Sequence, residues 1–248
     1  MTRVILITGA SRGIGAATVR LAAQRGYAVC VNYRSSAEAA RTLVAEIEQS
    51  GGRAIAVAAD VALESDVIRL FRTVDNELGT LSALVNNAGI LEPQADVDSM
   101  SAARLQRVFA TNVFGTMLCA REAVLRMSTK RGGSGGAIVN VSSMAARLGS
   151  PHEYVDYAAS KGAVDTFTIG LSKEVGDAGI RVNAVRPGLI DTDMHASGGE
   201  PGRIERLKGS VPMQRGGTAD EVANAILWLL SDEASYATGT FIDVSGGR

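Results

Sequence analysis

Seven short apolar segments alternate with longer amphipathic patterns along this chain, and this alternation restricts its fold more than any other feature. The segments occupy 4–8, 28–32, 54–58, 83–87, 137–143, 180–185 and 241–244. Helical patterns fill about 14–25, 36–50, 65–78, 99–131 (as two helices), 156–176 and 219–231. Apolar strands joined by crossover helices form parallel sheets that are buried on both faces. The sequence therefore predicts an α/β, Rossmann-type, doubly wound fold with a seven-stranded parallel sheet and helices on both faces.

Residues 1–248 are expected to form a single domain, since a chain of this length needs no second one. One long irregular stretch, about 188–217, contains SGGEPG and is typical of a functional lid or a disordered piece. The net charge of −1, without a basic block, indicates neither nucleic acid nor an anionic membrane as partner. The first strand starts at Val4, which leaves no room for a signal peptide, and no apolar run approaches the roughly 18 residues of a membrane span. We expect a cytoplasmic protein.

The stretch LITGASRGIGAATVR (6–20) admits two interpretations. It contains the G-x-S-x-G pattern of a serine hydrolase, in which Ser11 is the nucleophile and His195 and Asp191 complete a triad. Its three glycines, Gly9, Gly13 and Gly15, also fit a turn that approaches a dinucleotide pyrophosphate and begins a helix whose positive end faces the anion. The dinucleotide interpretation explains more, because here Ser11 follows the first strand of the sheet.

The end of the second strand indicates which dinucleotide would bind. An NAD site places a carboxylate about 20 residues after the glycine turn, where it binds the adenosine ribose. This chain has Asn32-Tyr33-Arg34-Ser35-Ser36 there, and no acidic residue before Glu38. Arg34 and Arg12 are suited to flank a 2′-phosphate, to which Ser35 would add a hydroxyl. The sequence therefore favours NADP(H) over NAD(H).

Proton-transfer chemistry is expected in the stretch VNVSSMAARLGSPHEYVDYAASKGAV (139–164). Tyr157 and Lys161 stand four residues apart at the start of a predicted helix, so their side chains share one face. A phenol has a reference pKa near 10, and a neighbouring ammonium favours its ionised form. Tyr154 lacks such a partner, because Ala158 stands four residues after it.

These motifs together resemble the short-chain dehydrogenase/reductase family, and the resemblance runs from end to end. The matching pieces are Thr8–Gly15, Asn86-Asn87-Ala88-Gly89, Asn112, Ser143, Tyr157-x-x-x-Lys161 and Pro187-Gly188. The resemblance implies an NAD(P)-binding Rossmann-fold enzyme that transfers a hydride between nicotinamide and a carbonyl or secondary alcohol substrate. It also implies a homotetramer.

The resemblance assigns roles to individual residues. Tyr157 would donate or accept the proton, and Lys161 would hold the nicotinamide ribose and lower the pKa of Tyr157. Ser143 would polarise the substrate oxygen, and Asn112 would shape the neighbouring helix and anchor a water that relays protons to Lys161. The expected cofactor-binding residues are Gly9, Ser11, Arg12, Gly13, Ile14, Gly15, Asn32, Arg34, Ser35, Asp60, Val61, Asn87, Ala88, Gly89, Tyr157, Lys161, Pro187, Gly188, Ile190 and Thr192.

The spacing between Ser143 and Tyr157 is fourteen residues, one more than is usual in the family. We attribute the difference to a one-residue insertion in the loop between them. The insertion makes three loop residues, His152, Glu153 and Tyr154, candidates for substrate contact. Met144, Leu148, Tyr154 and Met194 suggest a partly apolar pocket.

Three alternatives remain open. A 3-oxoacyl-carrier-protein reductase would dock an acidic carrier on basic residues, for which Arg126, Lys130 and Arg131 are candidates; Gly176–Gly179 supplies no base. The other two are the serine esterase using Ser11 and a non-catalytic NADPH sensor. No metal site is expected, because two histidines and two dispersed cysteines form no zinc-type cluster. The two cysteines, Cys30 and Cys119, are expected to be buried free thiols.

Overall fold

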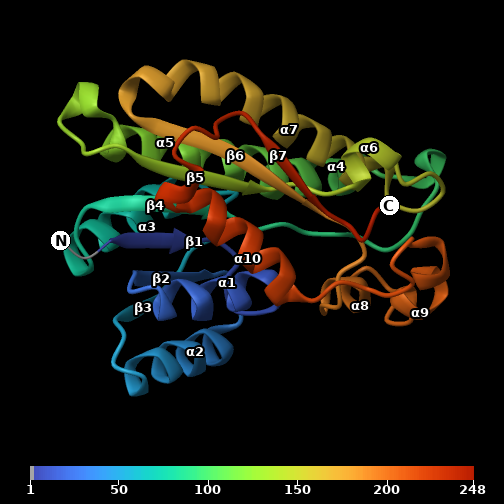
Figure 1. Ribbon diagram of the computed structural model, residues 1–248. Helices are drawn as coiled ribbons and strands as arrows, with labels where there is room; N and C mark the ends of the chain where they lie inside the picture. Colours follow the sequence, from blue (N-terminus) through green and yellow to red (C-terminus); the bar gives the residue numbers. More distant parts are fainter. Residues whose placement is uncertain (1–2) are drawn as a thin grey trace.

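A computed structural model describes residues 3–248, apart from the side chain of His195. Its sheet has seven parallel strands in the order β3-β2-β1-β4-β5-β6-β7 (Figure 1). The strands are β1 (Val4–Ile7), β2 (Ala28–Tyr33), β3 (Ala54–Ala58), β4 (Leu81–Asn86), β5 (Gly136–Val141), β6 (Ile180–Pro187) and β7 (Phe241–Val244). This architecture confirms the predicted doubly wound parallel sheet.

Strand β1 shows why these apolar segments form a sheet that is buried on both faces. Ile5 and Ile7 pack into one hydrophobic cluster, and Val4 and Leu6 pack into the other. All four side chains are at most 2% exposed. Because side chains alternate along a strand, a continuous apolar run supplies both cores at once.

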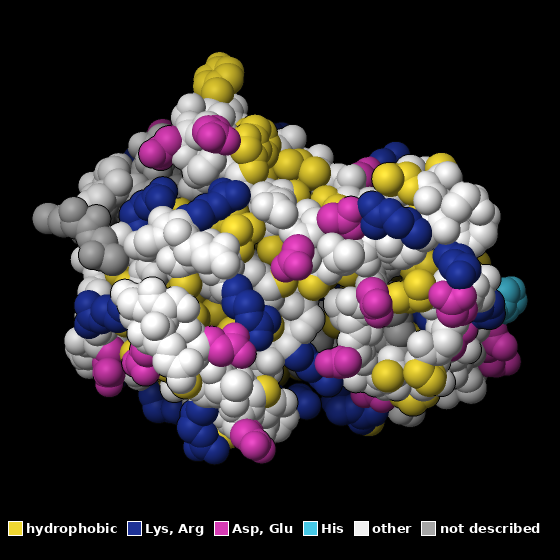
Figure 2. Space-filling model, turned by 60° about the horizontal axis from the view of Figure 1, so that its bottom comes forward, with side chains coloured by type: hydrophobic (Ala, Val, Ile, Leu, Met, Phe, Trp, Pro, Cys, Tyr) yellow, Lys and Arg dark blue, Asp and Glu magenta, His cyan; other side chains and the backbone are white. Residues whose placement is uncertain are grey.

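Helices cover each face of the sheet (Figure 1). The cluster that contains Ile5 includes buried residues of α1 (Gly13–Gln24), α2 (Ala37–Gln49) and α10 (Ala219–Leu230). The cluster that contains Leu6 includes buried residues of α3 (Glu64–Glu77), α5 (Gly115–Met127) and α7 (Val155–Val175). On the face drawn in Figure 2, positive and negative side chains occur among one another, in keeping with a net charge of −1.

The structure refines several expected boundaries. Strand β5 ends at Val141, so both Ser142 and Ser143 follow it. The two helices expected within 99–131 are α4 (Ala102–Phe109) and α5, and they are joined by a π-helical turn over Ala110–Phe114. One wider turn keeps the backbone continuous while changing the direction of its side chains.

The stretch 188–217 is more ordered than its composition suggested. It contains α8 (Met194–Ser197), α9 (Arg203–Leu207) and a 3-10 turn at Lys208–Ser210. A parallel bridge between Ile190 and Gly217 joins its two ends. We call residues 188–217 the lobe. The expected irregular stretch thus also contains short helices, which are held in place by the polar contacts described below.

The continuous helical stretch Ala102–Met127 is long and apolar enough, by length and composition alone, to cross a membrane. An 18-residue window of this stretch has a mean hydropathy of 1.2, and 50% of that window is buried inside the protein. A core helix passes the same test, so this is weak evidence for a membrane span. Cys119 on this stretch and Cys30 on β2 are both buried free thiols, as predicted, and burial raises the pKa of Cys119 to about 12.

Candidate active site

Two adjoining hollows open at the carboxyl ends of the strands, where the strand order reverses between β1 and β4. A cleft of about 610 Å³ runs along the glycine turn and the ends of β2 and β3. A pocket of about 440 Å³ lies beside the ends of β5 and β6. The residues that line both hollows are Ile14, Asn87, Leu91, Thr192 and Met194. This is the place where open α/β sheets bind ligands.

The glycine turn is held tightly against β4. Gly9 has φ +59°, and a Cβ atom there would lie 2.8 Å from the Cα atom of Ala88. The Asn87 amide donates hydrogen bonds to the carbonyl oxygens of Thr8 and Gly9, both at 2.9 Å. Gly15 packs beneath the turn, where a Cβ would lie 2.7 Å from the Gly9 oxygen, and does not line the cleft. Its role in this structure is close packing.

The start of α1 leaves its backbone donors available to an anion. Its N-cap residue, Arg12, makes no capping hydrogen bond, and the first turn contains no acidic residue. Helix α10, in contrast, begins with a complete capping box formed by Thr218 and Glu221. Because the first-turn N–H groups of a helix need a partner, an uncapped start beside a cleft is suited to a phosphate.

The far end of the cleft presents arginines. Arg12 and Arg34 both line it and are exposed, and the Arg12 guanidinium lies 3.4 Å from the Ser197 hydroxyl of the lobe. Asn32 is buried: it accepts a hydrogen bond from the Gly9 N–H and donates to the carbonyl oxygens of Val57 and Ala59. Asn32 thus ties three strand ends together besides lining the cleft.

Tyr157, Ser143 and Lys161 meet in the pocket. The Lys161 ammonium donates to the Val141 carbonyl at 2.7 Å and lies 5.5 Å from the centre of the Tyr157 ring. The Ser143 hydroxyl hydrogen-bonds the Tyr157 side chain. Ser142, the other serine after β5, points its hydroxyl at the backbone oxygen of Lys161, at 3.3 Å. Of the two serines, Ser143 is therefore the one joined to the tyrosine.

Burial dominates the ionisation of this pair. It raises the pKa of Tyr157 to about 12, against the opposing effect of the Ser143 hydrogen bond. It lowers the pKa of Lys161 to about 8, against the opposing charge of Asp165. The expected lowering of the tyrosine pKa by Lys161 is thus not seen in this structure, because loss of solvent disfavours both charged forms.

Asn112 lies in the π-helical turn and is fully buried. Its side chain accepts a hydrogen bond from the Ile90 N–H at 2.8 Å and donates to the Ile90 oxygen at 3.1 Å and to the Ser160 hydroxyl at 3.0 Å. It lines neither hollow. Asn112 therefore fastens the segment after β4 to α7, and its place in a water relay stays a prediction.

The other predicted cofactor residues line the hollows. Those in the cleft are Ser11, Gly13, Ile14, Ser35, Asp60, Val61, Asn87, Ala88, Gly89 and Thr192. Those in the pocket are Ile14, Asn87, Pro187, Gly188, Ile190 and Thr192.

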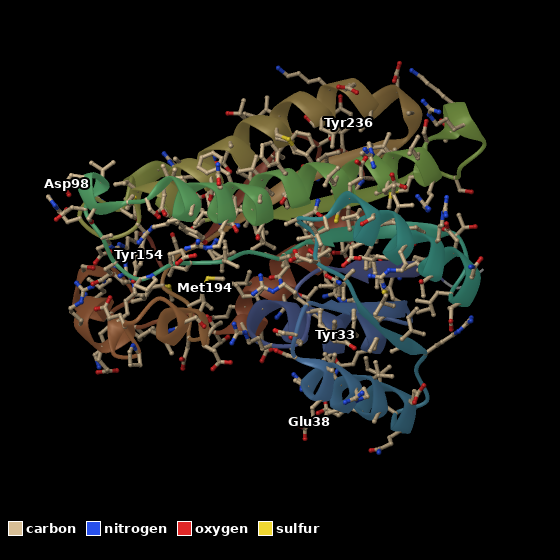
Figure 3. The ribbon with its side chains drawn as sticks, turned by 180° about the vertical axis from the view of Figure 1, so that it is seen from behind. Tyr33, Glu38, Asp98, Tyr154, Met194 and Tyr236 are labelled. Atoms are coloured by element: carbon tan, nitrogen blue, oxygen red, sulfur yellow. The ribbon has the colours of Figure 1, made fainter. Side chains whose placement is uncertain are left out.

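The outer part of the pocket is mainly apolar. Its apolar wall consists of Leu91, Met144, Ala145, Leu148, Pro151, Tyr154, Leu189 and Met194. Figure 3 places Tyr154 near Met194 of the lobe. The Tyr154 hydroxyl donates to the Gly198 oxygen at 3.2 Å. Of the three loop candidates, Glu153 and Tyr154 line the pocket, whereas His152 does not: its side chain is 87% exposed and contacts Asp96.

Ion pairs fasten the lobe to the loop before α7. Arg203 donates to Glu153 at 2.5 Å and to Glu200 at 2.9 Å, and its guanidinium lies 5.0 Å from the Tyr154 ring centre. Arg206 contacts the same two carboxylates. Arg203 and Arg248 line the pocket and were missed by sequence reasoning. Neither has a sequence signal, because each reaches the pocket only through the tertiary fold.

The triad proposed for a serine esterase finds no support in the described residues. Ser11 lines the cleft, but Asp191 lines neither hollow. The side chain of His195 lies outside the described residues. Within the part of the chain that the structure describes, no group of three or more His, Cys, Asp or Glu side chains is placed to hold a metal ion.

Comparison with known proteins indicates an oxidoreductase, in agreement with the geometry of the site. The profile of a family described as enoyl-(acyl carrier protein) reductase matches residues 9–248. The chain is 60% identical to the uncharacterised oxidoreductase YgfF of Escherichia coli K12, over 99% of both chains. It is 40% identical to a 3-oxoacyl-[acyl-carrier-protein] reductase of Synechocystis, over 99% of this chain and 96% of the other.

A solved structure extends the comparison to three dimensions. It is a blue fluorescent protein from a metagenomic library in complex with NADPH, with a TM-score of 0.90, 33% identity and coverage of 99% of this chain and 97% of the other. These matches extend along nearly the whole chain, and the protein belongs to the short-chain dehydrogenase/reductase family.

Proposed function

We propose that this oxidoreductase uses NADP(H) to interconvert a carbonyl compound and a secondary alcohol, with Tyr157 as proton donor and acceptor. The observation that carries the proposal is the meeting of Tyr157, Ser143 and Lys161 in the pocket that adjoins the cleft. An NADPH sensor without activity would have no need for a buried tyrosine and lysine beside a second, mainly apolar pocket.

The cleft fits a dinucleotide phosphate. A Cβ at Gly9 would collide with the Ala88 backbone, and the start of α1 presents uncapped N–H groups. Arg12 and Arg34 supply positive charge at the end where a 2′-phosphate would lie. The NADPH complex of the similar solved structure supports the same choice. Once bound, the nicotinamide would supply a hydride to the carbonyl carbon.

The residues of this chain then handle the substrate oxygen and the proton. The Ser143 hydroxyl donates a hydrogen bond to the carbonyl oxygen as negative charge develops there. Tyr157 transfers its phenolic proton to that oxygen, which yields the alcohol and leaves a phenolate. The Lys161 ammonium stabilises this phenolate. Alcohol oxidation runs through the same groups in reverse.

The pocket favours a compact, mainly apolar carbonyl compound. Its only charged wall residues are Glu153, Lys161, Arg203 and Arg248 among the described residues, and Glu153 and Arg203 neutralise each other.

A 3-oxoacyl thioester is the second candidate substrate, because a relative named for that activity is 40% identical to this chain. Docking of an acidic carrier would need free basic residues on the surface. Two of the three expected basic residues are already engaged, since Arg126 pairs with Asp75 and Glu122, and Lys130 pairs with Asp177. These pairs favour the compact carbonyl compound over the carrier-bound thioester.

Tyr157→Phe tests the proposed chemistry. We expect NADPH oxidation with a panel of cyclic and aromatic ketones to fall by at least about a hundredfold, because general acid catalysis contributes 10²–10⁴-fold. NADPH binding, followed by nicotinamide fluorescence, should remain. Tyr236→Phe, at an exposed tyrosine outside both hollows, is the control, and it should keep the activity. Activity of Tyr157→Phe equal to that of the wild type would contradict the proposal.

Arg34→Ala tests the cofactor preference. We expect tight NADPH binding and weak NADH binding by the wild-type protein, and a loss of about tenfold or more for NADPH alone in the variant, since a charge-assisted phosphate contact disappears. Arg41→Ala, on the neighbouring helix α2, serves as the control. Equal affinity of the wild-type protein for both nucleotides would leave the enzyme class intact and overturn the NADP(H) preference.

A further inference from the structure

Asp165 is a buried acidic residue for which the chemistry above has no use. It stands four residues after Lys161 on α7, as Lys161 stands four after Tyr157, so the three side chains form one row along the helix. Lys161 is 4% exposed and Asp165 is 9% exposed. The Asp165 Oδ1 atom is one of two buried side-chain atoms, within the described residues, that have no hydrogen-bond partner. A buried carboxylate oxygen without a donor is costly and calls for an explanation.

The other oxygen of this carboxylate is held from the sheet. Arg186 on β6 donates from Nε to Asp165 Oδ2 at 2.9 Å, and its Nη1 lies 3.5 Å from Asp243 on β7. Asp243 also accepts from Arg147 on α6 (Ala145–Leu148), at 3.1 Å. Residues of opposite charge therefore alternate outwards from the lysine, in the order Lys161, Asp165, Arg186 and Asp243.

The surroundings of Lys161 offer no other compensating carboxylate among the described residues. Its ammonium donates to the neutral Val141 carbonyl, and Gly89, where a Cβ atom would lie 3.6 Å from Nζ, brings no side chain. At the start of α7, Asp156 is already paired with Arg104 of α4. Of the acidic groups on α7 and the elements packed against it, Asp165 is the one whose charge opposes the effect of burial on the pKa of Lys161.

We propose that Asp165 is a positioning residue whose negative charge keeps the buried Lys161 in its ammonium form. This inference rests on the proposed function, in which the ammonium stabilises the Tyr157 phenolate. Burial alone favours a neutral amine, which could not do so. The negative charge of Asp165, one helical turn away, favours the ammonium form of Lys161 and leaves the N–H groups that face the pocket free to bind. The Oδ1 atom of Asp165, which has no hydrogen-bond partner among the described residues, agrees with a role through charge and not through a direct contact.

Asp165→Asn tests the proposal in the intact apo protein. The chain has four lysines, so the side-chain signals of ¹³C,¹⁵N-lysine-labelled protein can be followed by NMR as the pH is varied, and Lys161→Arg identifies the signal of Lys161. In the wild type the pKa of Lys161 is about 8. We expect a fall of about one unit or more in Asp165→Asn, since a nearby opposite charge shifts a pKa by about 1–3 units.

Asp243→Asn is the matched control, because it removes a carboxylate from the same arginine, Arg186, one step further from Lys161. We expect its Lys161 titration to match the wild type. A purely structural role of Asp165 predicts the opposite sign, since looser packing admits water and raises the pKa of a buried lysine. An unchanged or higher pKa in Asp165→Asn, or an equal fall in Asp243→Asn, would overturn the proposal.

If Asp165→Asn does not fold, Asp165→Asn with Arg186→Met removes both charges of the pair, which proteins tolerate better than one unpaired charge. The pKa of Lys161 must still fall, because the carboxylate lies on the same helix and the guanidinium on the next strand. Kinetics supply a second measurement. The rate of carbonyl reduction should decline at high pH, and in the variant this decline should move to lower pH by as much as the pKa of Lys161 falls. A wild type that reduces no carbonyl would refute the proposed function, while the NMR titration still decides the role of Asp165.

Discussion

Asp156, the residue before the proposed catalytic tyrosine, shows how one buried charge holds the site together. It forms a two-pronged ion pair with Arg104, at 2.7 and 3.2 Å, and accepts the Tyr157 N–H at 2.9 Å. Arg104 also donates to the Pro93 oxygen at 2.6 Å. This pair therefore joins α4, the segment after β4 and the start of α7. The side chains of Arg104 and Asp156 are 10% and 1% exposed.

Asp156→Asn should destabilise the protein by about 3–5 kcal/mol at pH 7, because it leaves a buried guanidinium without its countercharge. Burial raises the pKa of Asp156, but the Arg104 and Tyr157 hydrogen bonds outweigh it, so the pKa lies below its usual value. The stability from this group is thus present above about pH 4 and is lost as the pH falls through the lower native value.

Urea unfolding between pH 3 and pH 7 measures both effects. The difference between wild type and Asp156→Asn should shrink at the acid end. Asp177→Asn, in an exposed pair with Lys130, is the control and should cost less than about 1 kcal/mol. A cost for Asp156→Asn no greater than for this control would show that the buried pair is not important for stability.

At the level of single residues, sequence reasoning located Tyr157, Lys161 and Ser143 because their spacing along strand and helix brings them together. It could not distinguish a residue that lines the site from a buried residue that supports the site. Gly15 and Asn112 were expected to act at the site, and in the structure they support it from behind. Burial of that kind depends on packing between distant segments, which one sequence does not display.

Among the elements, the lobe carries the next prediction. Arg203→Met keeps a long side chain but removes the contacts with Glu153 and Glu200 and the stacking on Tyr154. Loss of such charge-assisted hydrogen bonds loosens the outer wall of the pocket, so KM for the carbonyl substrate should rise about tenfold, or ~1.4 kcal/mol. The NADPH affinity should change little.

Steady-state kinetics with varied carbonyl concentration measure the effect. Arg215→Met is the control, because it breaks an exposed ion pair with Glu221 that lies outside the pocket. Similar KM values for Arg203→Met and Arg215→Met would mean that the ion pairs of Arg203 do not shape substrate binding.

The elements also show where periodicity fails as a guide. Long helices and apolar strands were predicted to within a few residues, because burial of a whole face imposes a period on the sequence. The π-helical turn Ala110–Phe114 and the short helices α8 and α9 impose no such period. Their positions depend on contacts such as Arg203 with Glu153, which join residues fifty positions apart.

For the whole molecule, the alternation of strands and helices predicted the doubly wound, seven-stranded parallel sheet, while the strand order and its reversal between β1 and β4 came from the structure. The predicted homotetramer stays a prediction. Exposed apolar side chains on α5 and α7, among them Leu125 and Ile169, are available for association of subunits. The substrate could not be read from the sequence, because its pocket combines the loop before α7, the lobe and Arg248.

The position of Arg248 matters for anyone producing the protein. β7 runs towards the carboxyl ends of the other strands, so the chain reaches the pocket wall at Arg248, close to α6, while β1 starts at the opposite end of the sheet (Figure 1). Residues placed after Arg248, such as an affinity tag, would begin beside the substrate entrance. A tag attached before β1 would keep clear of it, and recombinant material for ligand screening is best made in that form.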